Sequence, residues 1–522
     1  MKKFLNKNSI LLTLTSLILL LGLPYSCNDD IEERNDKYPQ LNPTNPDANA
    51  GTWQTILLTA PDEFSLDAPI AANSPAFTRE LNEIRSYQAN ITKEQKRIIK
   101  YWSVGGVVRW NEIMRTLVAK HNRPPYQNPD GSYPIPSGAN PFANPEFPFA
   151  NPPYAARAYA YVSAAQYDAL VATWHYKSVY NRQAPFMVDE TLPVLIPKST
   201  LPSYPSEDGV IAGVTVEILK LLFPTEIAYI QQKAEEEKLY RIISGANVRS
   251  DVEAGITLGR KIAGKFITKA ASDGAGVAVG NQEIWTFLET QAIANGETPW
   301  KSLDLPSRPP MLPLFGNVKS MLMTPADVIA NRPVPPPSTN SLQFLAELQE
   351  VKRYSKKASR REMEIVSFWA DGVGTYTPPG HWNAIAVDAF VNENFSEVRW
   401  ARNMALLNIS MMDAAISCWD AKYFYFNPRP SQVDSSIKTL TGIPNFPAYV
   451  SGHSTFSAAA ATFLSHVLPD RAADFDAMAN EASLSRLYGA IHYRSDCEKG
   501  LLLGNAVGNF AVQRALNDGA DQ

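Results

Sequence analysis

The sequence of 522 residues contains only three cysteines, Cys27, Cys418 and Cys497. Three cysteines cannot form a disulfide framework, so Cys418 and Cys497 are expected to be buried free thiols. Positive charge is not in excess either, since the formal net charge is -4. Nucleic-acid binding therefore has no support in the composition, and any anion site must be built locally.

Long apolar runs are confined to the N-terminus. A short basic segment precedes an apolar run over residues 10–23, which has the length of a signal-peptide core and is short for a membrane span. The run ends at Cys27, which follows a small residue as in bacterial lipoprotein cleavage sites. We expect residues 1–27 to be a lipoprotein-type signal peptide and Cys27 to carry a lipid. A plain signal peptide or an uncleaved anchor is the alternative.

Acidic residues at positions 29 and 30 resemble signals that send some lipoproteins outward. The predicted localisation is therefore export, with lipid anchoring to the bacterial cell envelope at the outer membrane. Residues 28–75 are polar and rich in proline and asparagine, and we predict that they form a tether.

Strand-like alternation is scarce, whereas helical periodicity is clear over residues 94–118, 154–174 and 346–369. The predicted fold class is mainly α. Two proline-rich stretches, 124–153 and 299–337, interrupt the helices and are predicted to be long loops.

An internal repeat with an offset of 245 residues organises the chain. Trp174 and Lys177 are matched by Trp419 and Lys422. The same offset pairs Asp168 with Asp413, Arg157 with Arg402, Ser206 with Ser451, and Arg241 with Arg486. A constant register over more than a hundred residues predicts a duplicated helical bundle.

Only the second copy carries the residues needed for chemistry. Positions Gly452, His453 and His492 correspond to Glu207, Asp208 and Asn247 in the first copy. We therefore predict a degenerate N-terminal bundle over 76–285, a proline-rich connector over 286–345, and a catalytic bundle over 346–522. The first bundle is expected to be a structural partner.

Three segments of the second copy supply a coherent set of groups. They contain Lys422 and Arg429, then Ser451-Gly452-His453, then Arg486, His492 and Asp496. The three cations can surround a tetrahedral oxyanion, and the start of a helix at Ser451 also favours an anion.

The histidines of these segments can divide their roles. One imidazole can bond to the central atom of the anion while the other moves protons. Asp496 lies four residues after His492, so both fall on one helical face and Asp496 can orient the ring.

These segments together resemble the superfamily shared by type-2 phosphatidic acid phosphatases, bacterial acid phosphatases and vanadium-dependent haloperoxidases. The resemblance is strong over residues 365–500, and one departure is Val450, where the family usually has proline. Membrane lipid phosphatases of this superfamily have several spanning helices and the small acid phosphatases have one bundle. The duplication therefore resembles the haloperoxidases.

The resemblance implies vanadate as cofactor and hydrogen peroxide and halide as substrates, with hypohalous acid as product. It implies that vanadate bonds to His492 and that His453 takes a proton from peroxide. Asp371 in "FWADG" would pair with Arg486. The resemblance further implies that the oxygens of vanadate are neutralised by Lys422, Arg429, Ser451, Gly452 and Arg486, and that Trp419 and Phe446 lie on the halide route.

Two alternatives stay open. Phosphate can occupy the same site, and an exported acid phosphatase would hydrolyse phosphomonoesters through a phosphohistidine at His492, with His453 protonating the leaving alcohol. A binding lipoprotein with a relic site would have lost a site residue, and the second copy has lost none. His381 is interpreted as packing at a helix start, with a contact behind the site as the alternative.

Overall fold

The computed structural model describes residues 38–123, 129 and 151–521, and the predictions on residues 1–27 and Cys27 lie outside them. Two compact units are distinguished, Met1–Pro39 and Gln40–Gln522, and the second contains both copies of the repeat. Within the described ranges the secondary structure consists of helices, so the predicted mainly α class is confirmed. Cys418 and Cys497 are buried and free, as predicted.

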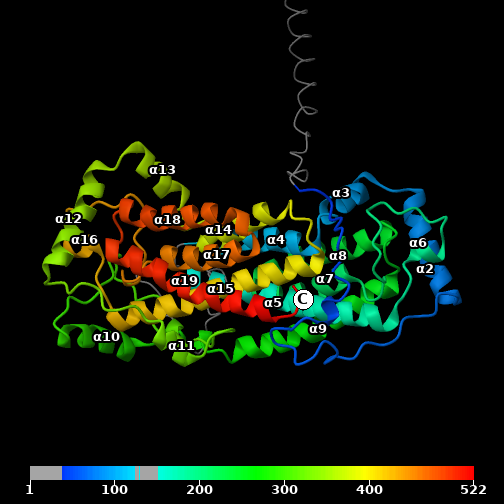
Figure 1. Cartoon of the computed structure of the whole chain (residues 1–522), viewed down its shortest axis with the longest axis horizontal. Helices are drawn as coiled ribbons and strands as arrows, with labels where there is room; N and C mark the ends of the chain where they lie inside the picture. The colour runs from blue at the N-terminus through cyan, green and yellow to red at the C-terminus, as the bar shows by residue number, and fades with distance from the viewer. Residues whose placement is uncertain (1–37, 124–128, 130–150, 522) are drawn as a thin grey trace, which may run out of the picture. The chain divides into compact units, whose positions relative to one another are not determined.

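Two 29-residue helices, α5 (Pro152–Tyr180) and α15 (Glu397–Tyr425), pack against each other in the middle of this unit (Figure 1). Nearly every residue of both helices is buried, because small and apolar side chains surround each helix on all sides. Asn151 and Ser396 cap their N-termini, and each helix ends at a residue in the left-handed conformation, Asn181 or Phe426.

The repeat seen in the sequence is present helix by helix. Residue 397 at the start of α15 follows residue 152 at the start of α5 by 245 positions, and four further helix pairs begin with the same offset. These pairs are α6 (Pro185–Val188) with α16 (Pro430–Val433), α7 (Glu207–Leu222) with α17 (Gly452–Val467), α8 (Ile227–Ile243) with α18 (Ala472–Tyr488), and α9 (Arg249–Ala271) with α19 (Arg494–Asn517).

The contacts inside the two copies are repeated as well. The backbone N–H of Ser206 donates to the carbonyl of Asp251 at 3.0 Å, and Ser451 donates to Asp496 at 2.9 Å. Each bond ties the N-terminus of one helix to the first turn of another, α7 to α9 and α17 to α19. The two copies therefore position equivalent backbone frames.

The copies meet at equivalent residues. Asn408 on α15 donates to the hydroxyl of Ser163 on α5 at 3.0 Å, and these positions are also 245 apart. The side-chain amides of Asn408 and Asn383, which lies on α14 (Thr377–Phe390), each donate one hydrogen bond to the oxygen of the other. A residue that contacts its own counterpart lies at a two-fold axis, so the two bundles are related by a pseudo-two-fold axis through α5 and α15.

Residues 40–70 run along α5, so the described part of the segment predicted as a tether over 28–75 packs against the first bundle instead. The carboxylate of Asp168 accepts the backbone N–H groups of residues 56–58 at 2.6–2.9 Å. Trp174 donates its indole N–H to Pro46, and the Tyr180 hydroxyl donates to Leu66. A proline-rich polar segment can pack in this way because helix side chains satisfy its backbone.

The proline-rich connector lies along α15 in the same manner. Asp413 accepts the backbone N–H groups of Met321 and Leu322 at 3.2 Å. Trp419 donates to the carbonyl of Met311, and the Tyr425 hydroxyl donates to that of Pro333. The two proline-rich segments are thus equivalent arms, one for each bundle.

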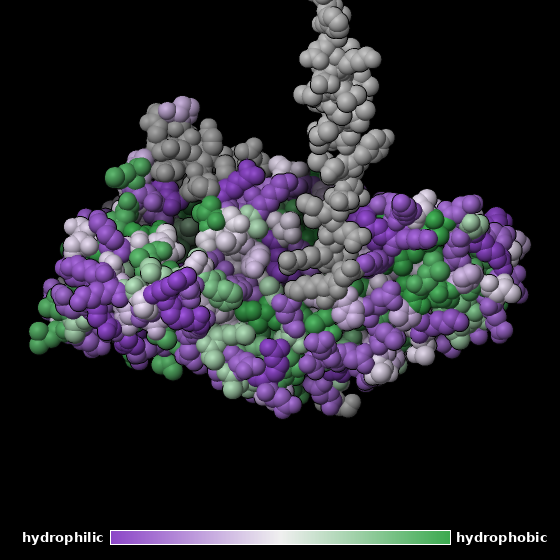
Figure 2. All heavy atoms as spheres, turned by 90° about the horizontal axis from the view of Figure 1, so that it is seen from above, coloured by the Kyte–Doolittle hydropathy of each residue, from purple (hydrophilic) through white to green (hydrophobic). Residues whose placement is uncertain are grey.

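Further helices cover these bundles. Helix α14 packs against α5, α15 and α17, and α13 packs against α18. No described helix is long and apolar enough to cross a membrane. On the face shown in Figure 2, hydrophilic side chains alternate with smaller apolar patches. The remaining α-helices are α2 (Pro75–Ala89), α3 (Lys93–Trp102), α4 (Gly106–His121), α10 (Gln282–Ala294), α11 (Pro325–Ala330), α12 (Leu342–Lys357) and α13 (Arg360–Phe368).

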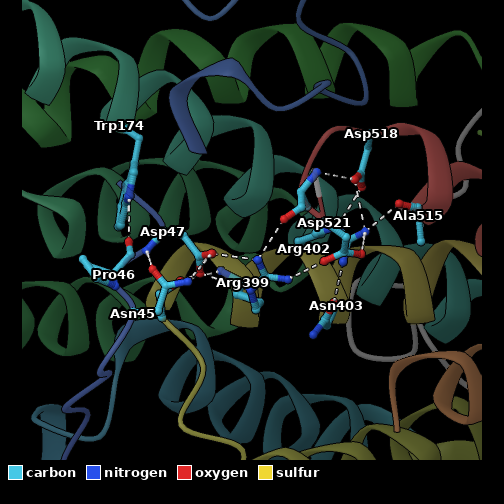
Figure 3. A network of polar contacts seen from close by, with 12 residues as sticks. Asn45, Pro46, Asp47, Trp174, Arg399, Arg402, Asn403, Ala515, Asp518 and Asp521 are labelled. Carbon is cyan, nitrogen blue, oxygen red and sulfur yellow. Dashed lines mark hydrogen bonds and ion pairs between the residues drawn. The ribbon is translucent and has the colours of Figure 1, made fainter. Parts of the chain in front are cut away.

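A network of charged groups joins the first arm, the start of α15 and the C-terminal residues (Figure 3). Arg399 contacts Asp47 of the arm at 2.7 Å and Asp521 at 2.9 Å. One turn further along, Arg402 pairs with Asp518 at 2.8 Å, and both side chains are almost fully buried. The first copy has the equivalent pair, Arg157 with Asp273 at 2.7 Å.

We expect Arg402→Met to lower the free energy of unfolding by about 3–5 kcal/mol, because it leaves Asp518 buried without its partner. The matched control is Arg360→Met, since Arg360 is 92% exposed and its ion pair with Glu364 is solvated, so little change is expected. Urea unfolding at constant m-value measures both. Equal effects of the two substitutions would contradict the importance of the buried pair.

Candidate active site

The three segments singled out in the sequence come together beside a cavity of about 210 Å³, which Lys422, Arg429, Ser451 and Asp496 do not themselves line. Lys422 comes from the last turn of α15, and Arg429 directly precedes α16. Ser451 caps α17, Arg486 lies in the last turn of α18, and His492 precedes α19. The predicted residues that line the cavity are Asp371, Trp419, Phe446, Gly452, His453, Arg486 and His492.

Lys422 is fully buried and has no carboxylate partner among the described residues. Its ammonium group donates to the carbonyls of Pro447, Ala448 and Val450 at 2.8, 3.1 and 2.5 Å. Burial lowers the pKa of Lys422. The contacts fix the loop that leads into Ser451, and Lys422 must exchange one carbonyl to reach an anion directly.

Arg429 is also fully buried. Its Nε donates to the carbonyl of Phe446 at 2.9 Å, and its Nη1 donates to the carbonyl of Ile491 at 2.8 Å and contacts Nε2 of His492 at 3.0 Å. Its Nη2 is buried and has no hydrogen-bond partner among the residues that the structure describes. Burial lowers the pKa of Arg429 to about 10. The guanidinium group therefore retains an unused donor beside His492.

Arg486 is the third buried cation, and burial lowers its pKa to about 10 as well. Its Nε donates to the Ser485 hydroxyl at 2.8 Å and its Nη2 to the carbonyl of Trp369 at 2.6 Å. The predicted direct pair of Arg486 with Asp371 is not formed between these two described residues. Asp371 contacts His381 instead, at 3.0 Å, although its charge still favours the charged form of Arg486.

The site therefore has three buried cations, and within the described part of the chain none of them forms an ion pair with a carboxylate. Backbone carbonyls satisfy their donors but carry no net charge. Burying charge without a counter-charge is unfavourable, so a site of this kind favours an anionic ligand. The arrangement suits an anion with several oxygens.

The hydrogen bonds of His492 determine its tautomer. Because an arginine N–H can only donate, Nε2 of His492 accepts from Arg429 and Nδ1 carries the proton. Nδ1 donates to Asp496 at 2.9 Å, which is the predicted orienting contact. Burial, followed by the charges of Arg429 and Lys422, lowers the pKa of His492 well below its usual value. His492 thus presents a neutral ring with a lone pair on Nε2.

The start of α17 provides the remaining groups. Ser451 caps the helix, accepting the N–H of Ser454 at 3.3 Å. Gly452 lines the cavity, and a Cβ there would make ordinary van der Waals contact with Phe456 at 3.7 Å and Trp419 at 3.9 Å. Nε2 of His453 is buried without a hydrogen-bond partner among the described residues, and burial lowers the pKa of His453 well below its usual value.

The predicted aromatic pair, Trp419 and Phe446, lies at the cavity with ring centroids 5.0 Å apart. The Lys422 ammonium is 4.9 Å from the Phe446 centroid, and the Arg429 guanidinium carbon is 5.1 Å from it. The aromatic faces thus lie beside two of the buried cations and offer them a favourable π contact.

The equivalent place in the first copy also has a cavity, of about 160 Å³, but carboxylates of the protein stand beside it. Glu207, at the position of Gly452, pairs with Lys177 and Arg241 at 2.9 Å each. Asp208, at the position of His453, pairs with Arg241 at 3.0 Å. The carboxylates supply inside the first bundle the negative charge that the second bundle lacks.

Several cavity residues could not be predicted from the sequence. Asn122 and Pro152 of the first copy and Arg308 of the connector line the cavity beside the second-copy groups. None of them belongs to a recognisable pattern, because their proximity depends on how the two bundles pack. His381 was interpreted as packing at a helix start, and its contact with Asp371 favours the alternative, a contact behind the site.

Comparison with known proteins finds a superfamily match and similar folds. Residues 403–519 match the PAP2 superfamily. A search of curated protein sequences found no match. The fold is similar to that of a bacterial vanadium-dependent iodoperoxidase, at 24% identity and a TM-score of 0.54, covering 70% of this chain and 91% of that one. It is also similar to a bacterial vanadium-dependent chloroperoxidase in its holo form, at 13% identity and a TM-score of 0.50, covering 74% and 96%.

We expect Glu207→Gln to destabilise the protein by about 3 kcal/mol, because Lys177 and Arg241 lose the charge that compensates them. Inorganic phosphate at millimolar concentration should restore part of this loss beyond its effect on the wild type, since an oxyanion can replace the carboxylate. Thermal unfolding with and without phosphate measures both effects. Glu217→Gln is the control, because Glu217 pairs with Lys220 at the surface. An unchanged thermal stability of Glu207→Gln would contradict the proposed role of Glu207 in compensating the charges of Lys177 and Arg241.

Proposed function

We propose that this protein, whose residues 403–519 form a PAP2 superfamily domain, is a vanadate-dependent haloperoxidase. It would oxidise halide with hydrogen peroxide to hypohalous acid. The observation that carries the proposal is the set of three buried cations without ion-paired carboxylates around Nε2 of His492. Similarity in fold to vanadium-dependent peroxidases supports it.

The residues present fit vanadate. Arg429 offers a buried Nη2 donor without a partner among the described residues, and the lone pair on Nε2 of His492 becomes available when Nη1 of Arg429 turns to the anion. Lys422, Arg486, Ser451 and Gly452 complete the set that would hold its oxygens. Phosphate, with the same shape and charge, would occupy the same groups. Bound vanadate would supply a Lewis acid that activates hydrogen peroxide without a change in oxidation state.

The protein's own groups would bind the anion and move the proton. His453 is kept neutral by burial, so it can accept a proton from peroxide. Asp496 holds the Nδ1 proton of His492 and keeps Nε2 directed at the anion. Trp419 and Phe446 would border the route of the halide, beside Lys422 and Arg429.

Phosphomonoester hydrolysis is the second candidate, and the same lone pair on His492 favours it. Nε2 would attack phosphorus, and Asp496 would stabilise the positive ring of the phosphohistidine. His453 would then have to donate a proton to the leaving alcohol. We favour the peroxidase reaction because the solved structures of similar fold are vanadium-dependent peroxidases.

Export and anchoring of the protein by a lipid on Cys27 belong to the same proposal. They are supported by the N-terminal sequence, where an apolar run precedes Cys27. Globomycin treatment of producing cells should leave an unprocessed form, and palmitate labelling should be lost in Cys27→Ala. Unchanged labelling would refute lipidation at this residue.

The deciding experiment uses protein purified in the presence of a chelator and divided in two. One half receives orthovanadate and is assayed for peroxide-dependent oxidation of bromide and iodide. The other half, without vanadate, is assayed for hydrolysis of a phosphomonoester. We expect vanadate-dependent halide oxidation that falls at least about a hundredfold in His492→Ala, because the ligand to the anion is lost.

His175→Ala is the matched control, since His175 lies on α5 of the first copy and outside the cavity. Phosphatase turnover that vanadate inhibits, without halide oxidation, would overturn the peroxidase proposal and favour the second candidate. Absence of both activities would contradict both.

A further inference from the structure

A histidine outside the predicted set lies directly behind the site. Nδ1 of His381 contacts both carboxylate oxygens of Asp371, at 3.0 and 3.1 Å. One of these oxygens is 3.9 Å from Nε2 of His453, which is beyond hydrogen-bond distance. The carboxylate is thus bonded to His381 and held short of His453.

The position of His381 is closely fixed. It lies in the first turn of α14, and its side chain is 10% exposed. Its ring stacks on Trp369 with centroids 4.6 Å apart and an interplanar angle of 29°, and it makes a T-shaped contact with Phe368 at 5.0 Å. These ring contacts leave His381 little freedom to turn, so its Nδ1 stays directed at Asp371.

Asp371 is held in an unusual conformation. It is a non-glycine residue with a φ of 44°, in the left-handed region, and its carboxylate is almost fully buried. Such conformations persist where surrounding contacts enforce them, and they are frequent at functional sites. The contact with His381 is one of the interactions that hold this carboxylate.

We propose that His381 is a positioning residue, which holds the carboxylate of Asp371 short of His453 and away from Arg486. That His453 moves a proton in catalysis rests on the proposed function. The restraint itself rests on the contacts of His381 with Asp371 and the aromatic rings.

The charges around His453 determine the direction of the effect. The titratable and charged groups acting on it are Asp371, Arg486, His381 and His492. Asp371 is the one acid among them. Released from His381, its carboxylate can close on His453 or on Arg486. The first contact stabilises the imidazolium and the second removes repulsion from Arg486, so either one raises the proton affinity of His453.

The test compares two amide replacements of His381. In His381→Asn the amide nitrogen can take the place of Nδ1, whereas in His381→Gln it reaches the position of Nε2 and the contact with Asp371 is lost. We expect the proton affinity of His453 to rise about tenfold in the Gln variant and to stay near wild type in the Asn variant. Asp371→Asn should lower it.

Ring NMR of the full chain labelled with ¹⁵N-histidine measures this directly, because the sequence has six histidines and His453→Gln identifies the signal of His453. His466→Asn is the control for loss of an imidazole elsewhere. In the wild type, His453 can stay neutral down to the pH at which the protein unfolds in acid. In that case we expect a titration of His453 above this unfolding pH in the Gln variant and in neither of the other two proteins.

The proposal would be overturned if His453 titrated at the same pH in the wild type, the Asn variant and the Gln variant. It would also be overturned if the titration of His453 shifted equally in both variants, because this would indicate an effect of ring packing alone. The pH limb of activity that reports His453 should move upward in the Gln variant by the same factor. If the titrations behave as expected but neither activity is found, the proposed function fails and the positioning role of His381 stands.

Discussion

Three buried positive charges without contacting carboxylates are the constraint around which the second bundle is built. Removing an ion from water costs several kcal/mol even after the protein relaxes. Here the cost is offset by hydrogen bonds from the cations to backbone carbonyls, which belong to the loops before α17 and α19 and to Trp369. The cations therefore hold the loops, and the loops present Ser451, Gly452 and His492 to the cavity. Structure and charge cannot be altered independently at this place.

The first bundle satisfies the same constraint in another way. It retains Lys177 and Arg241 but brings in Glu207 and Asp208 to neutralise them. The first bundle has the same helices as the second and the same kind of N-terminal cap at Ser206, and its hydrogen bond from Ser206 to Asp251 has an equivalent in the second bundle. The bundle framework consequently does not depend on an external anion. What differs between the copies is where the negative charge comes from.

Much of the candidate site could be predicted, because each of its groups lies at a fixed place relative to a helix end. The constant offset of 245 identified equivalent positions, and helical spacing identified the contact of His492 with Asp496. Such patterns report which side of a helix a residue occupies. They therefore sufficed for the helices, the repeat and the convergence of the three segments.

What could not be predicted depends on contacts that leave no periodic pattern. The arm over residues 40–70 has a composition typical of a linker, and its order comes from side chains of α5 that bond its backbone. The donors of Lys422 go to carbonyls, which every residue has. The choice of Asp371 between Arg486 and His381 depends on a turn with a positive φ and on the packing of Trp369.

The hydrogen bond between Ser163 and Asn408 has a consequence for the history of the chain. In a symmetric dimer of two identical single-bundle chains, a residue on the axis would face a copy of itself, serine opposite serine or asparagine opposite asparagine. Once the bundle was duplicated, the two sides of the axis could mutate separately and form a pair of unlike residues. The same freedom let one half exchange its ligand-binding groups for carboxylates while the other kept them. The molecule is thus organised as a dimer with one working subunit, and it should bind one anion per chain.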